Sequence, residues 1–317
     1  MPDQVYCVFD IGGTKILLYL IDGAKRVLHK ERFPTPAQCT PEQMIEFINR
    51  SAAASLARAG LPSTDLAGLG ICIAALLDYE KGVVHQSPNL GWYAAVPLRE
   101  MLQQSWNCPV YLDNDANAAV LGEVAYGAAR GHRNAIYITI STGIGGGLYL
   151  DGKVFRGSGG FAGEVGHIKP FGQGRRCGCG GMDCLEAWAS GGAIARMAKE
   201  LWDEKEQGGT ITTAWVFDQA QGGNPLARSI IEQALQNIST GLANLVTLLN
   251  PSCLVIGGGV VASREDFLEQ IRARVYELAV APAVHISTVE IKAAQLGSEA
   301  GIWGLYYLMR CPDEQRA

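Results

Sequence analysis

The sequence predicts a mixed α/β protein built from two related halves, and three observations lead to this prediction. β-rich runs alternate with amphipathic helical patterns along the chain, which is typical of layered α/β folds. One module, in which a strand enters a glycine-rich bend and leaves as a second strand, occurs twice. The 317 residues are 48% hydrophobic with a mean hydropathy of +0.09, which is enough to bury the core of one long domain or two ordinary ones.

The first copy of the module opens the chain. A β-rich run over residues 5–9 enters a glycine bend at 10–15 (DIGGTK). The chain leaves this bend as a second strand over 16–21 and turns at 22–23.

The second copy lies near the middle of the chain. A strand over 135–140 enters the glycine run 141–147 (STGIGGG), and a strand over 148–150 leads to a turn at 151–152. Two halves that each present a glycine loop at a strand end would flank a cleft, which is where ligands commonly bind.

Helical and strand patterns fill the rest of the chain. A helical pattern covers 41–56 and is followed by a strand over 69–73. A longer apolar stripe covers 226–249 after Asn224-Pro225, a helix start signal, and a further strand begins at 253–256.

Charge and composition exclude several classes of partner. The net charge of -5 and the pI near 5.6 predict no basic face for nucleic acid. The start of the chain lacks the features of a signal peptide, and no apolar stretch approaches the roughly 18 residues of a membrane span. Nine scattered cysteines do not form a secreted disulfide framework. We therefore expect a cytoplasmic protein with no membrane partner.

The first glycine bend is a candidate phosphate site. Adjacent Gly12 and Gly13 let the backbone approach a ligand, so that amides and the Thr14 hydroxyl can donate to phosphate. Asp10 would face a metal ion or its waters, and Lys15 would add positive charge. The alternative is an ordinary strand-ending turn.

The second glycine run is a denser candidate for phosphate. The hydroxyls of Ser141 and Thr142 stand beside Gly143 and Gly145, and a plain hairpin does not need so many glycines. Neither loop has the G-x-x-x-x-G-K-[ST] spacing, so a P-loop NTPase is excluded.

A third glycine run, Gly257, Gly258 and Gly259, leads into a match to G-x-G-x-x-A of dinucleotide sites. No acidic residue ends a second strand about 20 residues later, as the ribose contact of such a site would require, and the run lies late in the chain. These glycines would equally let an adenine and ribose lie flat against the backbone.

An acidic loop, 113–117 (DNDAN), joins a short strand over 110–112 to a helical run over 118–125. Helix capping explains one such residue well and four poorly. A carboxylate near a helix N-terminus stays ionised and can accept a proton from a hydroxyl. We take Asp115 as the candidate base and Asn114 as the amide that orients the hydroxyl.

A cysteine-rich loop predicts a structural zinc site. Three thiolates and one imidazole complete a tetrahedral set with no open position. The alternatives are buried free thiols, or a redox pair, for which the C-x-C spacing is wrong. Zinc would fix the loop that carries Glu164 and Glu186, two acids able to bind a polyol. The four predicted ligands are His167, Cys177, Cys179 and Cys184.

In combination these motifs resemble the ROK family of repressors and sugar kinases, part of the actin-like ATPase superfamily, almost from end to end. The matching segments are the first phosphate motif at 10–15, the catalytic aspartate loop at 113–117, the second phosphate motif at 141–147, the E-x-G-H sugar signature at 164–167, the zinc motif at 177–186 and the adenosine motif at 257–259.

The resemblance implies a duplicated actin-like ATPase fold, of the ribonuclease H-like kind, with two domains flanking a cleft. The small domain would comprise 1–117 and 301–317, and the large domain 118–300. The resemblance further implies a homodimer, a catalytic Asp115, and a His167 that reaches both zinc and sugar through its two ring nitrogens. The sugar hydroxyls would meet Asn114, Asp115, Glu164, His167 and Glu186.

The activity that the resemblance implies is an ATP-dependent and Mg²⁺-dependent hexose kinase acting on the 6-hydroxyl of a sugar. The segment 88–92 (PNLGW) is most like the N-L-G-W segment of bacterial glucokinases, so Asn89 is also expected at the sugar. N-acetylmannosamine kinases are the nearest alternative. Ala74-Ala75, where members often have Pro-Gly, and Asp183, a frequent Gly, depart from the family pattern.

Three other classes of function compete with a kinase. A sugar sensor without catalysis would bind sugar and consume no ATP. A nicotinamide oxidoreductase is suggested by the third glycine run alone. A zinc hydrolase would require an open position on the metal.

Overall fold

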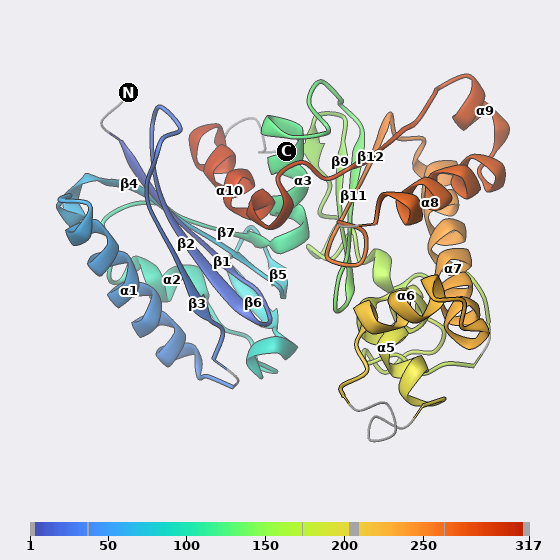
Figure 1. Ribbon diagram of the computed structural model, residues 1–317. Helices are drawn as coiled ribbons and strands as arrows, with labels where there is room; N and C mark the ends of the chain where they lie inside the picture. Colours follow the sequence, from blue (N-terminus) through green and yellow to red (C-terminus); the bar gives the residue numbers. More distant parts are fainter. Residues whose placement is uncertain (1–3, 37, 173, 203–208, 263, 313–317) are drawn as a thin grey trace. The chain divides into compact units, whose positions relative to one another are not determined.

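The computed structural model describes residues 4–36, 38–172, 174–202, 209–262 and 264–312, and it confirms the mixed α/β class (Figure 1). The chain separates into two compact units. The first unit contains 1–130, 147–162 and 298–317, and the second contains 131–146 and 163–297.

The first unit is built on a five-stranded sheet in the order β3-β2-β1-β4-β7. β1 is antiparallel to β2 and parallel to β4, and β4 is parallel to β7. Across these parallel pairs Asp10 lies opposite Cys72, and Cys72 lies opposite Asp113. The sheet therefore aligns three polar side chains near the carboxyl ends of its parallel strands. The strands are β1 (Val5–Ile11), β2 (Lys15–Asp22), β3 (Val27–Pro34), β4 (Leu66–Ile73) and β7 (Val110–Asn114), with β5 (Leu76–Asp78) and β6 (Val83–Gln86) as a separate pair.

The α-helices described in this unit are α1 (Pro41–Arg58), α2 (Leu98–Gln103), α3 (Asp115–Tyr126) and α10 (Ala300–Arg310). α1 begins where the sequence predicts, because Thr40 and Gln43 form a capping box at its N-terminus. α10 packs very closely on α3. A Cβ at Gly304 would lie 1.7 Å from the Ala118 carbonyl oxygen, and a Cβ at Gly122 would lie 2.3 Å from that of Ala300. Both glycines are therefore needed for this helix contact.

The second sheet has the order β10-β9-β8-β11-β12, the same succession as the first, so the predicted repeat is confirmed. β8 is parallel to β11, and β11 is parallel to β12. β9 carries the chain from the second unit to the first after Gly146. The strands are β8 (Ala135–Ile140), β9 (Ile144–Leu150), β10 (Lys153–Val154), β11 (Cys253–Gly257) and β12 (Glu290–Ala293).

The helices of the second unit begin at the end of the zinc motif, and the longest of them contains the long apolar stripe. The stripe forms α7, which Asn224 caps at its start and Asn250, in the left-handed conformation, ends. The helices are α4 (Leu185–Ala189), α5 (Gly191–Lys199), α6 (Thr213–Gln221), α7 (Pro225–Leu249), α8 (Glu265–Leu278) and α9 (Ala281–His285). Short 3₁₀ turns occur in the first unit at η1 (Ser63–Asp65) and η2 (Pro88–Leu90), and in the second unit at η3 (Val165–His167). A further one, η4 (Gly297–Glu299), lies where the chain passes from the second unit back to the first.

Two expected element boundaries are wrong. α3 starts at Asp115 rather than 118, because the Asn114 side chain accepts from the backbone N–H groups of Ala116 and Asn117 and caps the helix there. β9 starts at Ile144 rather than 148, so three of the glycines predicted to form a loop lie in a strand.

The compact units also differ from the expected domain ranges. Residue 117 lies inside α3, which stays with the first unit as far as Tyr126, and residues 147–162 group with that unit as well. It stays a prediction that these two units are the small and large domains of a sugar kinase. Among the helices of the described ranges, none combines the length and hydropathy of a membrane span.

Candidate active site and metal centre

The first glycine bend is a tight turn between β1 and β2. The Gly12 N–H donates to the Lys15 carbonyl over 3.0 Å, and Gly13 and Thr14 are exposed at its tip. Thr35, just after β3, holds the turn from the side: its hydroxyl donates to the Gly12 carbonyl (2.7 Å) and its N–H to the Thr14 carbonyl (3.2 Å). The exposed tip leaves its backbone accessible to an anion.

Asn89 lies against this turn. A Cβ built on Gly13 would approach the Asn89 side-chain amide to 3.1–3.2 Å, so only glycine leaves the amide where it is. Asn89 is exposed on the η2 turn, which is anchored by the buried Trp92, whose indole N–H donates to the Cys39 carbonyl over 2.7 Å. The structure thus brings one predicted sugar residue onto the predicted phosphate loop.

Two carboxylates interact near the carboxyl ends of the first sheet. Burial, and then the charge of Asp115, raise the pKa of Asp10 to about 7, although the Cys72 thiol and Lys15 act in the opposite direction. Burial raises the pKa of Asp115 as well, partly offset by the Ala116 N–H that it accepts. A Cβ on Gly301 would lie 2.9 Å from the Cys72 sulfur, so α10 also starts close to these groups.

Asp115 is the first residue of α3, where the helix dipole favours its ionised form. Its neighbour Asn114 is held by both ends of its amide. The side-chain oxygen caps the helix, and Nδ2 donates to the Ala75 carbonyl over 3.1 Å. The departure at Ala74-Ala75 therefore lies in the turn that orients Asn114. A direct contact of Asn114 with sugar stays a prediction.

Asp113 carries an ion pair that the sequence pattern does not reveal. Its carboxylate is fully buried and receives the guanidinium of Arg156, which comes from the chain just after β10. The two residues are 43 positions apart, and no local motif links them.

The second glycine run divides into a loop and a strand. Ser141 and Thr142 are exposed, and their carbonyls accept the Gly191 and Gly192 N–H groups that begin α5, over 2.7 and 3.1 Å. Gly143 closes the loop by accepting the Ser141 N–H (2.8 Å). The N-terminus of α5 is thus held against the tip of the loop that is expected to bind phosphate.

The glycines inside β9 serve close packing, which corrects the expectation that the loop extends to Gly147. Gly145 lies in the strand rather than in the loop. A Cβ on Gly146 would lie 2.6 Å from Val165, and one on Gly147 would lie 2.3 Å from the Ala116 carbonyl oxygen in the first turn of α3.

The third glycine run turns the chain at the end of β11. Gly258 has φ of +92°, and a Cβ there would lie 2.3 Å from the Ile140 carbonyl oxygen. Gly257 lies close to Tyr137, while a Cβ on Gly259 would meet open space. Gly259 is therefore the one of the three that leaves room for a ligand, and its contact with adenosine stays a prediction.

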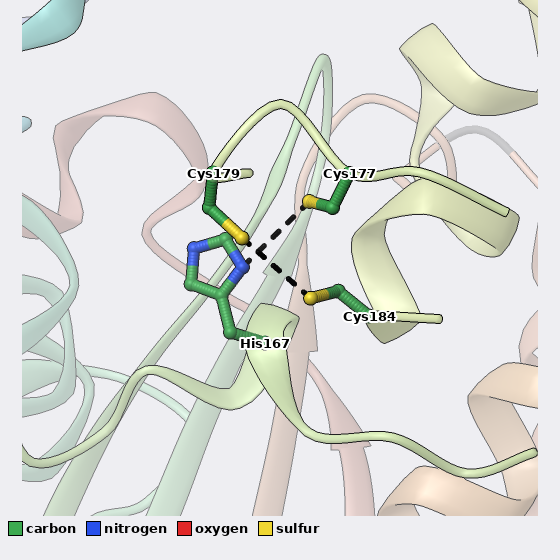
Figure 2. Close-up of side chains that lie close together, drawn as sticks. All are labelled: His167, Cys177, Cys179 and Cys184. Atoms are coloured by element: carbon green, nitrogen blue, oxygen red, sulfur yellow. Dashed lines mark hydrogen bonds between the residues drawn. The ribbon is translucent and has the colours of Figure 1, made fainter. Parts of the chain in front are cut away.

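Four side chains form the candidate metal centre, and Figure 2 shows them pointing toward one another. The ligand atoms of His167, Cys177, Cys179 and Cys184 all lie within 4.8 Å of one another. Zinc about 2.1–2.3 Å from each ligand would separate tetrahedral ligands by roughly 3.5–3.8 Å. The Cys179–Cys184 sulfur distance is 3.7 Å, and Nδ1 of His167 lies 3.9 Å from the Cys177 sulfur. The donor set and its spacing fit zinc.

The loop around this centre is held by its own backbone and by Asp183. The Cys177 N–H donates to the Gly181 carbonyl over 2.9 Å. Asp183 has φ of +58°, a left-handed conformation that glycine adopts more easily. Its carboxylate accepts the Arg175 N–H (2.8 Å) and the Trp188 indole N–H (3.3 Å). The aspartate thus makes contacts that a glycine could not.

The thiols differ in acidity. Burial raises the pKa of Cys177, and it raises the pKa of Cys184 to about 12. The Gly181 N–H lowers the pKa of the exposed Cys179. Burial therefore makes Cys177 and Cys184 harder to ionise than a free thiol, and a bound metal would displace their protons.

The predicted sugar residues of the second unit gather around the metal centre. Nε2 of His167, on the far side of the ring from Cys177, lies 3.7 Å from the Glu164 carboxylate. Glu186 spans two features: Oε1 lies 3.9 Å from the Cys177 sulfur, and Oε2 accepts the Ile144 N–H over 2.9 Å. No local sequence motif reveals this link from the metal centre to the second glycine loop.

Comparisons with known proteins give matches over nearly the whole chain. The model of the ROK family matches residues 6–311. The glucokinase of Streptomyces coelicolor is 34% identical over 316 residues, covering 96% of this chain and 97% of that protein. The N-acetylmannosamine kinase of Salmonella paratyphi B is 34% identical over 295 residues, covering 93% and 94%. Among solved structures, a ROK family glucokinase from Streptomyces griseus in complex with glucose and AMPPNP has a TM-score of 0.77 at 33% identity, covering 97% and 99%.

Proposed function

The chain belongs to the ROK family, and from that premise we propose that it is a glucokinase, an ATP-dependent kinase of the hexose 6-hydroxyl. One observation carries the proposal: a half-buried carboxylate, Asp115, stands at the N-terminus of α3 with a raised pKa and a neighbouring amide. A base of this kind is what a hydroxyl needs in order to attack phosphorus.

In the proposed reaction Asp115 accepts the proton of the sugar 6-hydroxyl. As that proton leaves, the oxygen forms a bond to the γ-phosphorus of ATP, and the bond from phosphorus to the bridging oxygen of ADP breaks. The products are hexose 6-phosphate and ADP, with the proton on Asp115. Such a transfer depends on positioning and electrostatics rather than on covalent help from the protein.

Backbone amides of the two glycine loops are the proposed phosphate donors. The exposed tips at Gly13-Thr14 and Ser141-Thr142 have accessible backbone, and Lys15 adds a positive charge beside the first. The third run, with Gly259 open, would take the adenosine.

Asp10 is the proposed residue for a divalent cation. Burial, and then the charge of Asp115, raise its pKa to about 7, and a cation would relieve the repulsion between the two carboxylates. Carboxylate oxygens also suit Mg²⁺, which would supply charge neutralisation of the phosphates when bound.

Glu164, His167 and Glu186 are the proposed sugar contacts of the second unit, with Asn89 and Asn114 those of the first. When zinc is bound by His167 and the three cysteines, it supplies structural support, because the tetrahedral set has no open position. His167 faces the cluster with Nδ1, which leaves Nε2 on the side of Glu164 for a hydroxyl.

An N-acetylmannosamine kinase is the second candidate, since a kinase of that sugar is as similar in identity as the glucokinase. The two sugars differ at carbon 2. The turn at Ala74-Ala75, which holds Asn114, is where a different preference would first be sought. A homodimer and a cytoplasmic location complete the proposal, on the strength of the family resemblance.

The experiment that tests the proposal is ADP release from MgATP with glucose, N-acetylmannosamine, N-acetylglucosamine, mannose and fructose in parallel. We expect release with glucose far above the others. Preference for an acetylated sugar would move the assignment to the amino-sugar kinases. Silence with every sugar, from a folded and zinc-loaded protein, would contradict a hexose kinase of these substrates, and sugar binding without ADP release would support a sensor.

A further inference from the structure

Arg156 forms a buried ion pair with Asp113, two residues before the candidate base Asp115. Its side chain is 11% exposed, and the carboxylate of its partner Asp113 is 0% exposed. Nη2 lies 2.5 Å from Oδ2 of Asp113 and Nε lies 3.5 Å from Oδ1, so the guanidinium presents its fork to the carboxylate. The guanidinium carbon lies 3.7 Å from the centre of the Tyr79 ring, which packs on the cation.

The Asp113 carboxylate contacts one residue on each side of Asp115, a backbone N–H before it and a side chain after it. Its Oδ1 accepts the Asn114 N–H over 2.9 Å and lies 3.5 Å from the Asn117 side-chain amide. One carboxylate thus contacts the residue just before the base and the residue two positions after it. A buried carboxylate keeps such a geometry only while its charge is paired.

The segment that carries Arg156 is itself held against the start of α3. β9 packs so closely that a Cβ on Gly147 would lie 2.3 Å from the Ala116 carbonyl oxygen. The Arg156 carbonyl accepts the Ala162 N–H over 3.0 Å, and a Cβ on Gly160 would lie 2.5 Å from the Leu77 carbonyl oxygen. The guanidinium is thus fixed on the same unit as the base, from a separate hairpin.

We propose that Arg156 is a positioning residue for phosphoryl transfer, which acts through Asp113 to hold Asp115 at the start of α3. This inference rests on the proposed kinase function. The Arg156 guanidinium contacts Asp113 and the Tyr79 ring, and it acts on the base through Asp113. We therefore expect its replacement to change the rate of the chemical step rather than sugar binding. Misplacing a catalytic group by about 1 Å costs roughly 100-fold in rate.

The test is the kinetics of Arg156→Met with glucose and MgATP. We expect kcat to fall about 100-fold while KM for glucose changes by less than about threefold. Arg156→Lys should recover part of kcat, because lysine restores the charge without the fork. Arg26→Met is the matched control, since Arg26 also pairs with a buried carboxylate, Asp22, at 2.6 Å in the turn between β2 and β3. Its kcat should equal that of the wild type.

A second variant separates positioning from folding. Asp113→Asn combined with Arg156→Met leaves no unpaired buried charge, and we expect it to fold with the same loss of kcat as Arg156→Met alone. A folded Arg156→Met enzyme that has wild-type kcat and only a lower Tm would overturn the inference, as would wild-type kcat in the double variant. A wild type silent with every sugar would instead overturn the proposed function, and the inference with it.

Discussion

At the scale of single residues, burial governs the two carboxylates of the candidate active site. Asp10 and Asp115 share one unit, and burial raises the pKa of each. The repulsion between them adds to the pKa of Asp10, which suits a carboxylate that awaits a cation. Asp115 has the start of α3 to favour its charge, which suits a base.

The first prediction is a pH dependence that follows from Asp115. A base must be deprotonated to act, and the pKa of Asp115 is raised above its usual range, so turnover should fall as the pH drops and do so earlier than an ordinary aspartate allows. The measurement is kcat against pH at saturating Mg²⁺ and glucose. We expect an acidic limb with a midpoint above about 4, the usual aspartate value. A kcat that stays level to pH 4 would contradict the prediction.

Residues with chemistry inside a recognisable motif could be predicted from the sequence, and residues that act from a distance could not. The DNDAN loop and the four metal ligands each lie in a short pattern whose chemistry can be argued locally. Thr35, which clamps the first glycine turn, and Arg156, which pairs with Asp113, come from other parts of the chain. Their roles depend on tertiary contacts that no periodicity reports.

At the scale of elements, the glycines of β9 have a different use from the one that the sequence suggests. Their density predicts a phosphate loop, and the loop is confined to the segment before Ile144. Gly146 and Gly147 instead let the strand touch Val165 and the first turn of α3. Glycine composition cannot separate approach to a ligand from approach to another backbone, because both need an absent Cβ.

The second prediction belongs to the scale of elements and concerns the metal centre. Removal of zinc by a chelator, or the change Cys184→Ser, should lower Tm and activity together, because the loop 177–186 loses its structural support. Cys108→Ser, outside the cluster, is the control. Calorimetry and ADP release on the same samples make the measurement. Activity lost while Tm is unchanged would point to a catalytic rather than a structural metal.

The link through Glu186 gives this centre an influence beyond its own loop. The carboxylate lies beside Cys177 and accepts the Ile144 N–H at the start of β9. Any disturbance of the cluster should therefore reach the second glycine loop as well as the sugar residues. The order of motifs along the sequence predicts that these segments belong to one site, but not which atom joins them.

At the scale of the whole molecule, the repeated strand order is the feature that the sequence predicts best. The strand, glycine bend and strand module appears twice in the chain, and each copy becomes the central part of a five-stranded sheet with the same succession. The residues at which the compact units begin and end are harder to predict from the sequence. A helix start such as α3 is set by the cap at Asn114, and the grouping of 147–162 with the first unit depends on packing between segments distant in sequence.

A kinase that phosphorylates glucose with Asp115 as the base should need that carboxylate for turnover and not for glucose binding. The most direct measurement compares ADP release by the wild type and by Asp115→Asn at saturating glucose and MgATP, together with glucose binding by calorimetry. We predict that the variant folds and binds glucose but loses about 100- to 10,000-fold of kcat. A folded Asp115→Asn protein with unchanged turnover would show that Asp115 is not the base.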